Sequence, residues 1–369
     1  MAPRPYRVIQ WGTGYTGTYA LKYILMHPAL ELVGVKCHTA QKEGLLATDI
    51  CAHGSSTVRT TRDKEAILSL EADCVIYMPR DALVDPTVPG SPSGAWLNEL
   101  VEILSTGKNV VTSIASGTHY AHLHDGATFL DKLNRACERG RSTVLFTGFD
   151  PGFSDVLAYT MSGAVGAVTQ IRTWEIVDYS TYPVPETLRA MGYGALPSEL
   201  STGALGVVRA TWGGVPYLLA QGLGVPIDSL QIDSDFHLSP RTFTAPGGLE
   251  VRRGTIGALR FTVAGTVEGK PLLSVNHITR IGPDMAPEWP TVGRDGGYRV
   301  EIDGFPPFRA DFPLGLPGGA GSTFADAMAM TAGRCVNCVG SVVEAAPGYK
   351  TFLDLMPIGT RLPTRRQSS

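Results

Sequence analysis

The sequence predicts an α/β fold that begins as a doubly wound parallel sheet and continues as an α+β domain with a mainly antiparallel sheet. Three observations predict it. A glycine-rich turn follows the first apolar strand, strands and helices alternate up to about residue 150, and the later strands are joined by short turns. Because alternating strands and helices form parallel sheets and tight turns join antiparallel strands, the architecture should change near that point.

The first strand, residues 6–10, runs directly into a glycine-rich turn and then into apolar residues at helical spacing. In such a turn the first glycine allows a tight bend, the second lets a pyrophosphate approach the backbone, and the third lets the helix pack closely. The helix start adds unpaired N–H groups. A purely structural turn is the alternative, but the position after the first strand favours a dinucleotide site at Gly12, Thr13, Gly14, Tyr15, Thr16 and Gly17.

The end of the second strand, residues 31–38, bears on the choice between NAD and NADP. An NAD site usually has a carboxylate about 20 residues after the glycines, where it binds the ribose hydroxyls. Here Glu31 lies at the opposite end of the strand, whereas Lys36, His38 and Lys42 follow near its end. Because cations bind a 2′-phosphate, we expect NADP as the cofactor. NAD stays open, since Lys36 and His38 can also be solvated loop residues.

The rest of the first part alternates between strands and helices. Strands are expected at 57–61, 74–78, 109–113 and 143–147, helices at 63–70, 95–105 and 127–139, and loops at 81–94 and 114–125. Ligands of a doubly wound sheet bind beyond the carboxyl ends of its strands. Met78, Pro79 and Arg80, which close the strand at 74–78, should therefore face the cofactor.

The second part has a different pattern. Helices are expected at 154–161, 185–191 and 203–212, and strands at 169–179, 259–267, 272–281, 298–302 and 308–312. The turn clusters Glu268-Gly269 and Asp303-Gly304 indicate hairpins. A last helix at 323–345 should return to the first part. We therefore expect a dinucleotide-binding domain at 1–153, a substrate and dimerisation domain at 154–322, the returning helix at 323–350 and a C-terminal segment at 351–369.

The composition is that of a folded protein, with 43% hydrophobic and 18% charged residues. A net charge of −3 gives no reason to expect nucleic acid or a membrane as partner. No apolar leader precedes the first strand, so a cytoplasmic location is expected.

The six cysteines are thinly spread, and Cys335-x-x-Cys338 is interpreted as two buried helix thiols rather than a redox or metal motif. No metal is expected.

Four sequence phrases together resemble a known family. They are VIQWGTGYTG at 8–17, GKNVVTS at 107–113, TGFDPGF at 147–153 and TAGRCVNCVGSVVEAAPG at 331–348. The chain resembles the dihydrodipicolinate-reductase-like proteins, most nearly the branch of 2,4-diaminopentanoate dehydrogenase and the native amine dehydrogenases. The resemblance implies NAD(P) in the first domain, a substrate pocket at the interdomain cleft, a homodimer, and reversible conversion of a carbonyl and ammonia into an amine.

The resemblance also assigns residues. It implies that Ser113 lies at the cofactor, that Gly148, Pro151 and Gly152 lie beside the nicotinamide, that Asn337 lies near the cofactor, and that Asp178, Tyr179, Thr181, Pro183 and Leu188 line the substrate pocket. Two departures stand out. Asp150 replaces the asparagine of the family's turn, and the glutamate that follows the NVVT strand in amine dehydrogenases has no counterpart between residues 113 and 120.

Proton transfer during catalysis therefore has several candidates: Asp150, His119, Tyr120, Glu175 and Tyr179. Asp150 can instead be a turn carboxylate, and His119 a surface loop residue. Glu175 and Tyr179 share a face only if their strand is regular. The apolar residues around Tyr179 favour a small, mainly apolar substrate. We expect an NAD(P)H-dependent oxidoreductase of the amine dehydrogenase type; a carbonyl reductase and a catalytically silent NADP sensor are the alternatives.

Overall fold

The computed structural model describes residues 4–79, 94–113, 120, 126–199, 203–355 and 357–360. The chain forms two compact units. The first comprises Met1–Gly152 and Met328–Ser369, and the second comprises Phe153–Ala327. The boundary near residue 327 falls inside helix α10 (Thr323–Glu344), whose later turns contribute to the core of the first unit.

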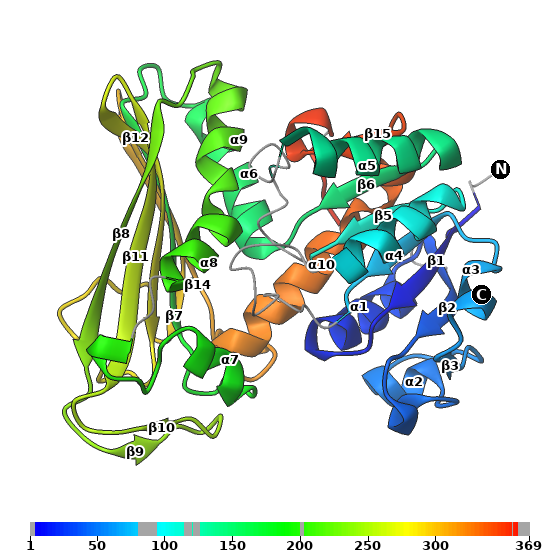
Figure 1. Cartoon of the computed structure of the whole chain (residues 1–369), viewed down its shortest axis with the longest axis horizontal. Helices are drawn as coiled ribbons and strands as arrows, with labels where there is room; N and C mark the ends of the chain where they lie inside the picture. Colours follow the sequence, from blue (N-terminus) through cyan, green and yellow to red (C-terminus); the bar gives the residue numbers. More distant parts are fainter. Residues whose placement is uncertain are drawn as a thin grey trace, which may run out of the picture. The chain divides into compact units, whose positions relative to one another are not determined.

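The first unit contains a seven-stranded sheet in the order β15-β6-β5-β4-β1-β2-β3, in which every pair is parallel (Figure 1). The strands are β1 (Tyr6–Trp11), β2 (Leu30–Lys36), β3 (Thr60–Thr61), β4 (Cys74–Tyr77), β5 (Asn109–Thr112), β6 (Thr143–Phe146) and β15 (Gly348–Lys350). Without β15 this is the 3-2-1-4-5-6 order of dinucleotide-binding folds. The predicted fold class is confirmed.

Helices cover both faces of this sheet (Figure 1). Helices α1 (Tyr15–Met26) and α10 pack on one face, where Ala20, Ile24, Ala332 and Val339 are buried. Helices α3 (Lys64–Leu68), α4 (Gly94–Ser105) and α5 (Gly126–Gly140) pack on the other. All four residues of β4 are buried, as expected of a short apolar strand covered on both sides. A short helix, α2 (Ala47–Cys51), packs beside α1.

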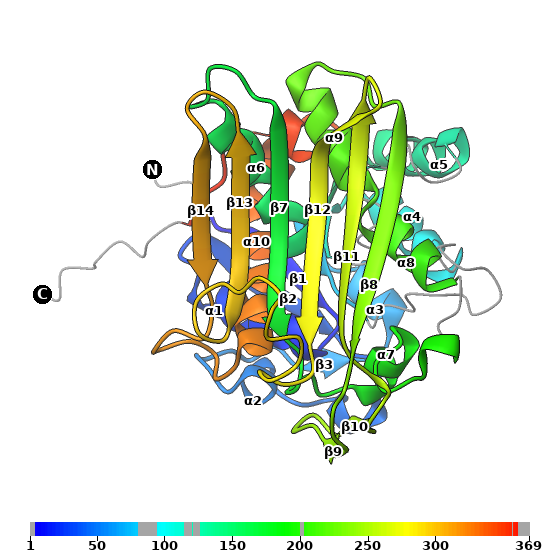
Figure 2. The same cartoon turned by 90° about the vertical axis from the view of Figure 1, so that its left-hand side faces the viewer.

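The second unit is built on a six-stranded sheet in the order β14-β13-β7-β12-β11-β8 (Figure 2). Its strands are β7 (Gln170–Asp178), β8 (Ser229–Leu238), β11 (Ile256–Val267), β12 (Lys270–Arg280), β13 (Gly296–Asp303) and β14 (Phe308–Pro313). Only the β7–β12 pair among them is parallel, so the sheet is mainly antiparallel as predicted. The predicted turn Glu268-Gly269 joins β11 to β12, with positive φ at both residues.

Three helices lie on one face of the second sheet: α6 (Ser154–Ser162), α8 (Gly203–Trp212) and α9 (Gly214–Leu223) (Figure 1). A further helix, α7 (Pro185–Ala190), follows β7 in the chain. A separate small ribbon is formed by β9 (Phe243–Thr244) and β10 (Glu250–Val251). The helices give the sheet one covered face, on which buried functional groups can lie.

The sequence did not predict α9, β8, β9, β10 or β15. Helix α9 begins with Gly-Val-Pro, which resembles a turn, although proline is tolerated in the first turn of a helix. Strand β8 lies at the sheet edge and none of its ten residues is buried, so its sequence has no clear alternation. Strand β15 has only three residues. Strands β8 and β15 pair with strands that are distant in the sequence, whereas β9 and β10 pair with each other across a short turn.

The six cysteines are all buried free thiols. Cys335 and Cys338 belong to α10 and pack in the core of the first unit. Burial raises the pKa of Cys338 to about 11 and that of Cys335 well above its ordinary value. The interpretation of this pair as buried helix thiols is confirmed.

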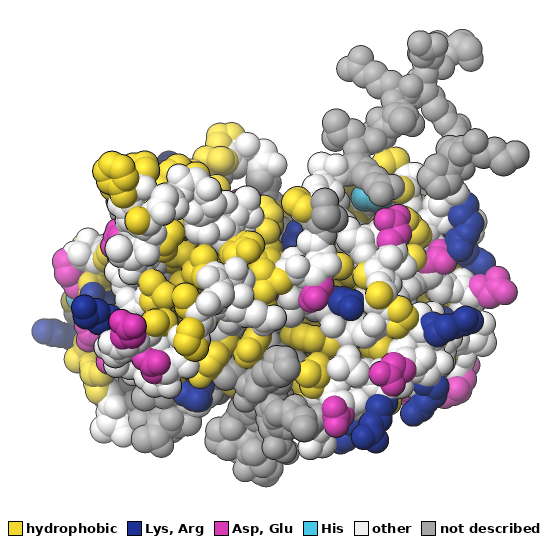
Figure 3. All heavy atoms as spheres, turned by 90° about the horizontal axis from the view of Figure 1, so that it is seen from above, with side chains coloured by type: hydrophobic (Ala, Val, Ile, Leu, Met, Phe, Trp, Pro, Cys, Tyr) yellow, Lys and Arg dark blue, Asp and Glu magenta, His cyan; other side chains and the backbone are white. Residues whose placement is uncertain are grey.

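No helix in the described part of the chain is long and apolar enough to span a membrane. Figure 3 shows one face of the molecule, on which acidic and basic side chains are interspersed. This mixture agrees with the small net charge of −3.

Candidate active site

The glycine turn after β1 has the geometry of a dinucleotide cradle. Gly12 has φ of +100°, and a Cβ at this position would lie 2.1 Å from the Met78 carbonyl oxygen. A Cβ on Gly17 would lie 2.3 Å from the Gly12 carbonyl oxygen, whereas a Cβ on Gly14 would have no atom within 4 Å. The first and third glycines are therefore required by backbone contacts. Gly14 instead leaves open space where helix α1 begins, which fits a pyrophosphate.

Four strands of the first unit end at the same edge. The register pairs Trp11 with Tyr77, Tyr77 with Thr112, and Thr112 with Phe146. The residues that follow are the predicted cofactor residues Gly12, Met78, Pro79, Ser113 and Gly148, and this edge brings them together. The Met78 side chain packs in the core, so only its backbone lies beside Gly12.

Helix α10 supports the turn that follows β6. The Phe149 backbone N–H donates to Thr331 Oγ1 at 3.3 Å, and Cys335 Sγ donates to the Thr147 carbonyl at 3.3 Å. In this turn Pro151 and Gly152 are buried, Asp150 is half-buried, and Gly152 has φ of +138°. Sequence reasoning did not identify Thr331 and Cys335 as supports of this turn.

Asn337, which was expected near the cofactor, lies at the other edge of the first sheet, and its role stays a prediction. Asn337 lines a small pocket with Tyr6 and Leu30, the first residues of β1 and β2. This is the amino edge of the sheet, opposite to the glycine turn. Helix α10 runs from the carboxyl edge to the amino edge of the sheet. Asn337 follows Thr331 by six positions along this helix. That spacing moves the side chain about 9 Å along the helix, away from the cofactor edge.

The Lys36 side chain, predicted to bind the cofactor, is only 7% exposed, and its role at the cofactor stays a prediction. Lys36 Nζ donates to the Cys37 carbonyl at 2.9 Å and lies 5.8 Å from the Trp11 ring centre, and burial lowers its pKa. His38 is exposed. The half-buried Lys42 is different, since its ammonium donates to the Thr13 carbonyl in the glycine turn.

The structure gives little information on three other predicted site residues, Arg80, His119 and Tyr120. Arg80 and His119 lie outside the described residues. Tyr120 is described alone between segments that are not, and it is half-buried. Their predicted roles stay predictions.

In the second unit, Glu175 and Tyr179 lie together. Tyr179 Oη donates to Glu175 Oε1 at 2.7 Å, so the two side chains point to the same side of the sheet. Glu175 is only 5% exposed. Burial, followed by the charge of Glu175, holds the pKa of Tyr179 well above its ordinary value, so the phenol remains a hydrogen-bond donor in alkaline solution.

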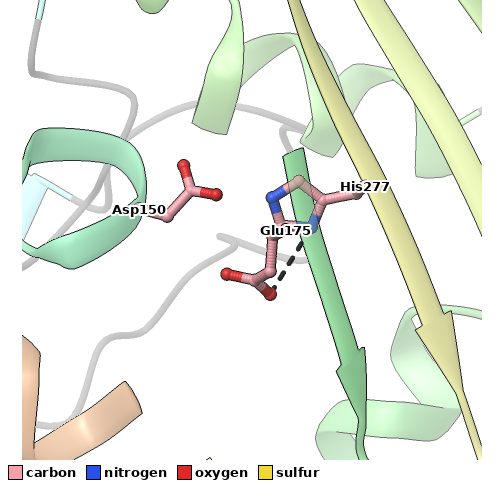
Figure 4. A group of neighbouring side chains, drawn as sticks. All are labelled: Asp150, Glu175 and His277. Atoms are coloured by element: carbon pink, nitrogen blue, oxygen red, sulfur yellow. Dashed lines mark ion pairs between the residues drawn. The ribbon is translucent and has the colours of Figure 1, made fainter. Parts of the chain in front are cut away.

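A residue that the sequence did not single out completes this group. His277 of β12 is the register partner of Glu175 on β7, and its Nδ1 lies 3.6 Å from Glu175 Oε1 (Figure 4). Both strands were predicted. The pairing of residues that are 102 positions apart could not be read from local periodicity, because the register of a parallel pair depends on the whole sheet.

Aromatic side chains surround this group. The His277 ring stacks on Phe261 and packs against Trp212, with ring centres 4.7 and 4.4 Å away. Tyr179 and Tyr182 pack against Phe324. This arrangement is a buried carboxylate among aromatic rings.

Two of the residues expected to line the substrate pocket, Asp178 and Thr181, lie in polar surroundings of the second unit. Asp178 Oδ1 accepts the backbone N–H groups of Ser180 and Gly282 and stabilises the chain after β7. Asp178 and Thr181 line a separate polar pocket with Asp295 and Asp326. Leu188, in contrast, is fully buried in the cluster that includes Tyr179 and Tyr182. Leu188 and Tyr179 thus belong to one apolar cluster, and the lining of the substrate pocket stays a prediction.

Comparisons with known proteins agree with one another. Residues 153–367 match the model of the 2,4-diaminopentanoate dehydrogenase C-terminal domain. The chain is 33% identical to an amine dehydrogenase of Streptomyces virginiae over 94% of this chain and 95% of that protein. It is 25% identical to the 2,4-diaminopentanoate dehydrogenase of Acetoanaerobium sticklandii over 95% and 93% of the two chains. The solved amine dehydrogenase of Mycobacterium smegmatis superimposes with a TM-score of 0.73 at 17% identity, covering 96% of this chain and 97% of that one.

Proposed function

The chain belongs to the family of 2,4-diaminopentanoate dehydrogenase and the amine dehydrogenases, and from this premise we propose that it aminates small, mainly apolar ketones and aldehydes with NADPH. Family membership makes it an NAD(P)-dependent dehydrogenase of the amine dehydrogenase type that acts on small molecules. The observation that supports the finer proposal best is the buried carboxylate of Glu175 among aromatic side chains.

The cofactor is proposed to lie along the carboxyl edge of the first sheet, with its pyrophosphate at Gly14. The nicotinamide supplies a hydride when it is bound. A preference for NADP is supported by Lys42, whose ammonium is held at the glycine turn by the Thr13 carbonyl. Glu43 follows directly but is engaged by Arg62, with N and O atoms 3.6 Å apart. A cation at this position favours a phosphate over ribose hydroxyls.

A Lys42→Ala protein should bind NADPH roughly 10- to 150-fold more weakly, because a charge-assisted hydrogen bond to phosphate is worth about 1.5–3 kcal/mol. NADH binding should change much less, since NADH has no 2′-phosphate. Fluorescence titration of both nucleotides measures this, with Lys270→Ala, an exposed lysine of the second unit, as the control. Equal losses for NADPH and NADH would mean that Lys42 supports only the turn.

Glu175 is proposed to move the proton that amination requires. As ammonium approaches the substrate, one of its N–H bonds breaks and the proton passes to the Glu175 carboxylate. The freed nitrogen lone pair attacks the carbonyl carbon, and one proton of the added nitrogen moves to the carbonyl oxygen, which becomes a hydroxyl. The proton held by Glu175 then goes to this hydroxyl, which leaves as water. An ammonium and a ketone thus become an iminium ion and water, with no net change in protons. Tyr179 holds the carboxylate in place throughout.

The substrate is proposed to be mainly apolar because of what surrounds Glu175. Leu188, Tyr193 and Leu249 are buried in one cluster with Tyr179 and Tyr182 at its edge. An aliphatic or cyclic ketone fits this chemistry better than an amino acid.

The proposal is tested by NADPH oxidation with a panel of aliphatic ketones, cyclic ketones, aldehydes and keto acids, each with and without ammonium at alkaline pH. We expect turnover with the apolar members that requires ammonium, and little turnover with the keto acids. A preference for keto acids would contradict the substrate class. Turnover that is indifferent to ammonium would make the protein a carbonyl reductase.

The homodimer and the cytoplasmic location that were expected from the sequence stay predictions.

A further inference from the structure

His277 has no role in the mechanism given so far, yet it is one of the most enclosed polar side chains of the second unit. It is 3% exposed, and Glu175 beside it is 5% exposed. Taking two ionisable groups out of water costs several kcal/mol per charge unless they compensate each other. A histidine in the middle of a sheet therefore needs a partner, and the register of β7 and β12 supplies Glu175.

The imidazole ring is held in one orientation. It is stacked on Phe261 with an angle of 9° between the planes, while Trp212 of α8 packs against it with a ring-centre distance of 4.4 Å. Aromatic faces favour a cation between them. Trp212 Nε1 is itself buried and has no hydrogen-bond partner among the described residues. A second N–H donor therefore lies next to the imidazole ring.

The ring orientation directs Nδ1 toward one oxygen of Glu175 (Figure 4). The same Oε1 accepts the Tyr179 hydroxyl. Two groups therefore act on a single carboxylate oxygen. Tyr193 and Tyr298 are further titratable side chains of this unit beside the pair, and Tyr298 is the register partner of Glu175 on β13. Burial raises the pKa of Tyr193, so this phenol stays neutral in the range where histidine titrates.

We propose that His277 is a positioning residue for amination, which acts through Glu175 by keeping that buried carboxylate ionised and ready to accept the proton of ammonium. This inference rests on the proposed function. When the pH falls, the first proton goes to His277, and the resulting imidazolium stabilises the Glu175 carboxylate. Without the imidazole, burial alone would raise the proton affinity of Glu175 and neutralise it at higher pH.

The test is the pH profile of kcat/KM for ammonium-dependent NADPH oxidation by the whole protein. In His277→Asn, the acid limb should move to higher pH by about one unit or more, the size of shift that an opposite charge at this distance produces. His277→Gln keeps an N–H donor and serves for the same comparison if the asparagine variant does not fold. An unmoved acid limb in a folded variant would overturn the proposal.

A double variant separates a positioning role from an independent one. If His277 acts only through Glu175, then Glu175→Gln/His277→Asn should lose no more kcat than Glu175→Gln alone. Losses that multiply would overturn the proposal. The matched control is a less buried pair of the same kind, the half-buried His237 and the exposed Glu288, which lie 3.7 Å apart. His237→Asn and Glu288→Gln should leave the profile unchanged.

The two proposals fail in different ways. If the natural protein shows no ammonium-dependent turnover with any carbonyl compound, the proposed function fails. If the natural protein aminates but its acid limb is the same in the His277 variants, only the role of His277 fails.

Discussion

A Gly14→Asp protein should fold normally and lose NADPH binding by roughly 100-fold or more, which corresponds to about 2.8 kcal/mol. A Cβ at this position meets no atom within 4 Å, so the fold has room for the side chain. Aspartate is moreover favoured as the N-cap of a helix, and Gly14 is the N-cap of α1 without a side-chain cap of its own. The new carboxylate would stand where the pyrophosphate is proposed to bind. Nucleotide titration together with thermal unfolding measures both effects.

Two control variants define the cause of this loss. Gly14→Asn has nearly the same shape without the charge, so its smaller loss would identify electrostatic repulsion. Gly12→Ala should instead destabilise the protein, because its Cβ would lie 2.1 Å from the Met78 carbonyl oxygen. Normal NADPH binding by Gly14→Asp would contradict the placement of the cofactor at this turn.

A Glu175→Gln protein should bind NADPH normally and lose about 10²–10⁴-fold in kcat for amination, the usual contribution of a positioned acid or base. Glutamine keeps the shape, and its amide oxygen can still accept the Tyr179 hydroxyl. It cannot accept the ammonium proton at neutral or alkaline pH. Steady-state kinetics at saturating ketone, with ammonium varied, measure the loss.

The matched control for this variant is Glu288→Gln, which removes an exposed carboxylate that also faces a histidine. It should be as active as the natural protein. A Glu175→Gln protein with nearly full kcat would show that another group moves the proton. Asp150, His119 and Tyr120 would then be the next candidates.

The sequence predicted the fold well because its strongest signals are local. The glycine turn, the short apolar strands and the hairpin turn at Glu268-Gly269 each need only neighbouring residues to form. The structure adds a reason for two of the glycines, since Gly12 and Gly17 approach backbone oxygens too closely to carry a Cβ. Elements such as β8 and β15 were missed because distant neighbours stabilise them.

The site was harder to predict because it depends on the direction of a helix and on the register of paired strands. Lys36 lies in the last part of β2, where both faces are buried, so alternation gave no sign that its side chain is enclosed. Asn337 was displaced from the cofactor edge by the direction of α10. His277 could be found only once the register of β7 and β12 was known. The absence of a carboxylate between residues 113 and 120 pointed to a substitute, and Glu175 was already among the candidates.

The reaction that we propose joins ammonia to a carbonyl compound. The most direct measurement is mass spectrometry of the product formed from a cyclic ketone, NADPH and ¹⁵N-labelled ammonium. We expect an amine that carries the heavy nitrogen, in an amount equal to the NADPH oxidised. An alcohol formed in that amount, without any labelled amine, would contradict it.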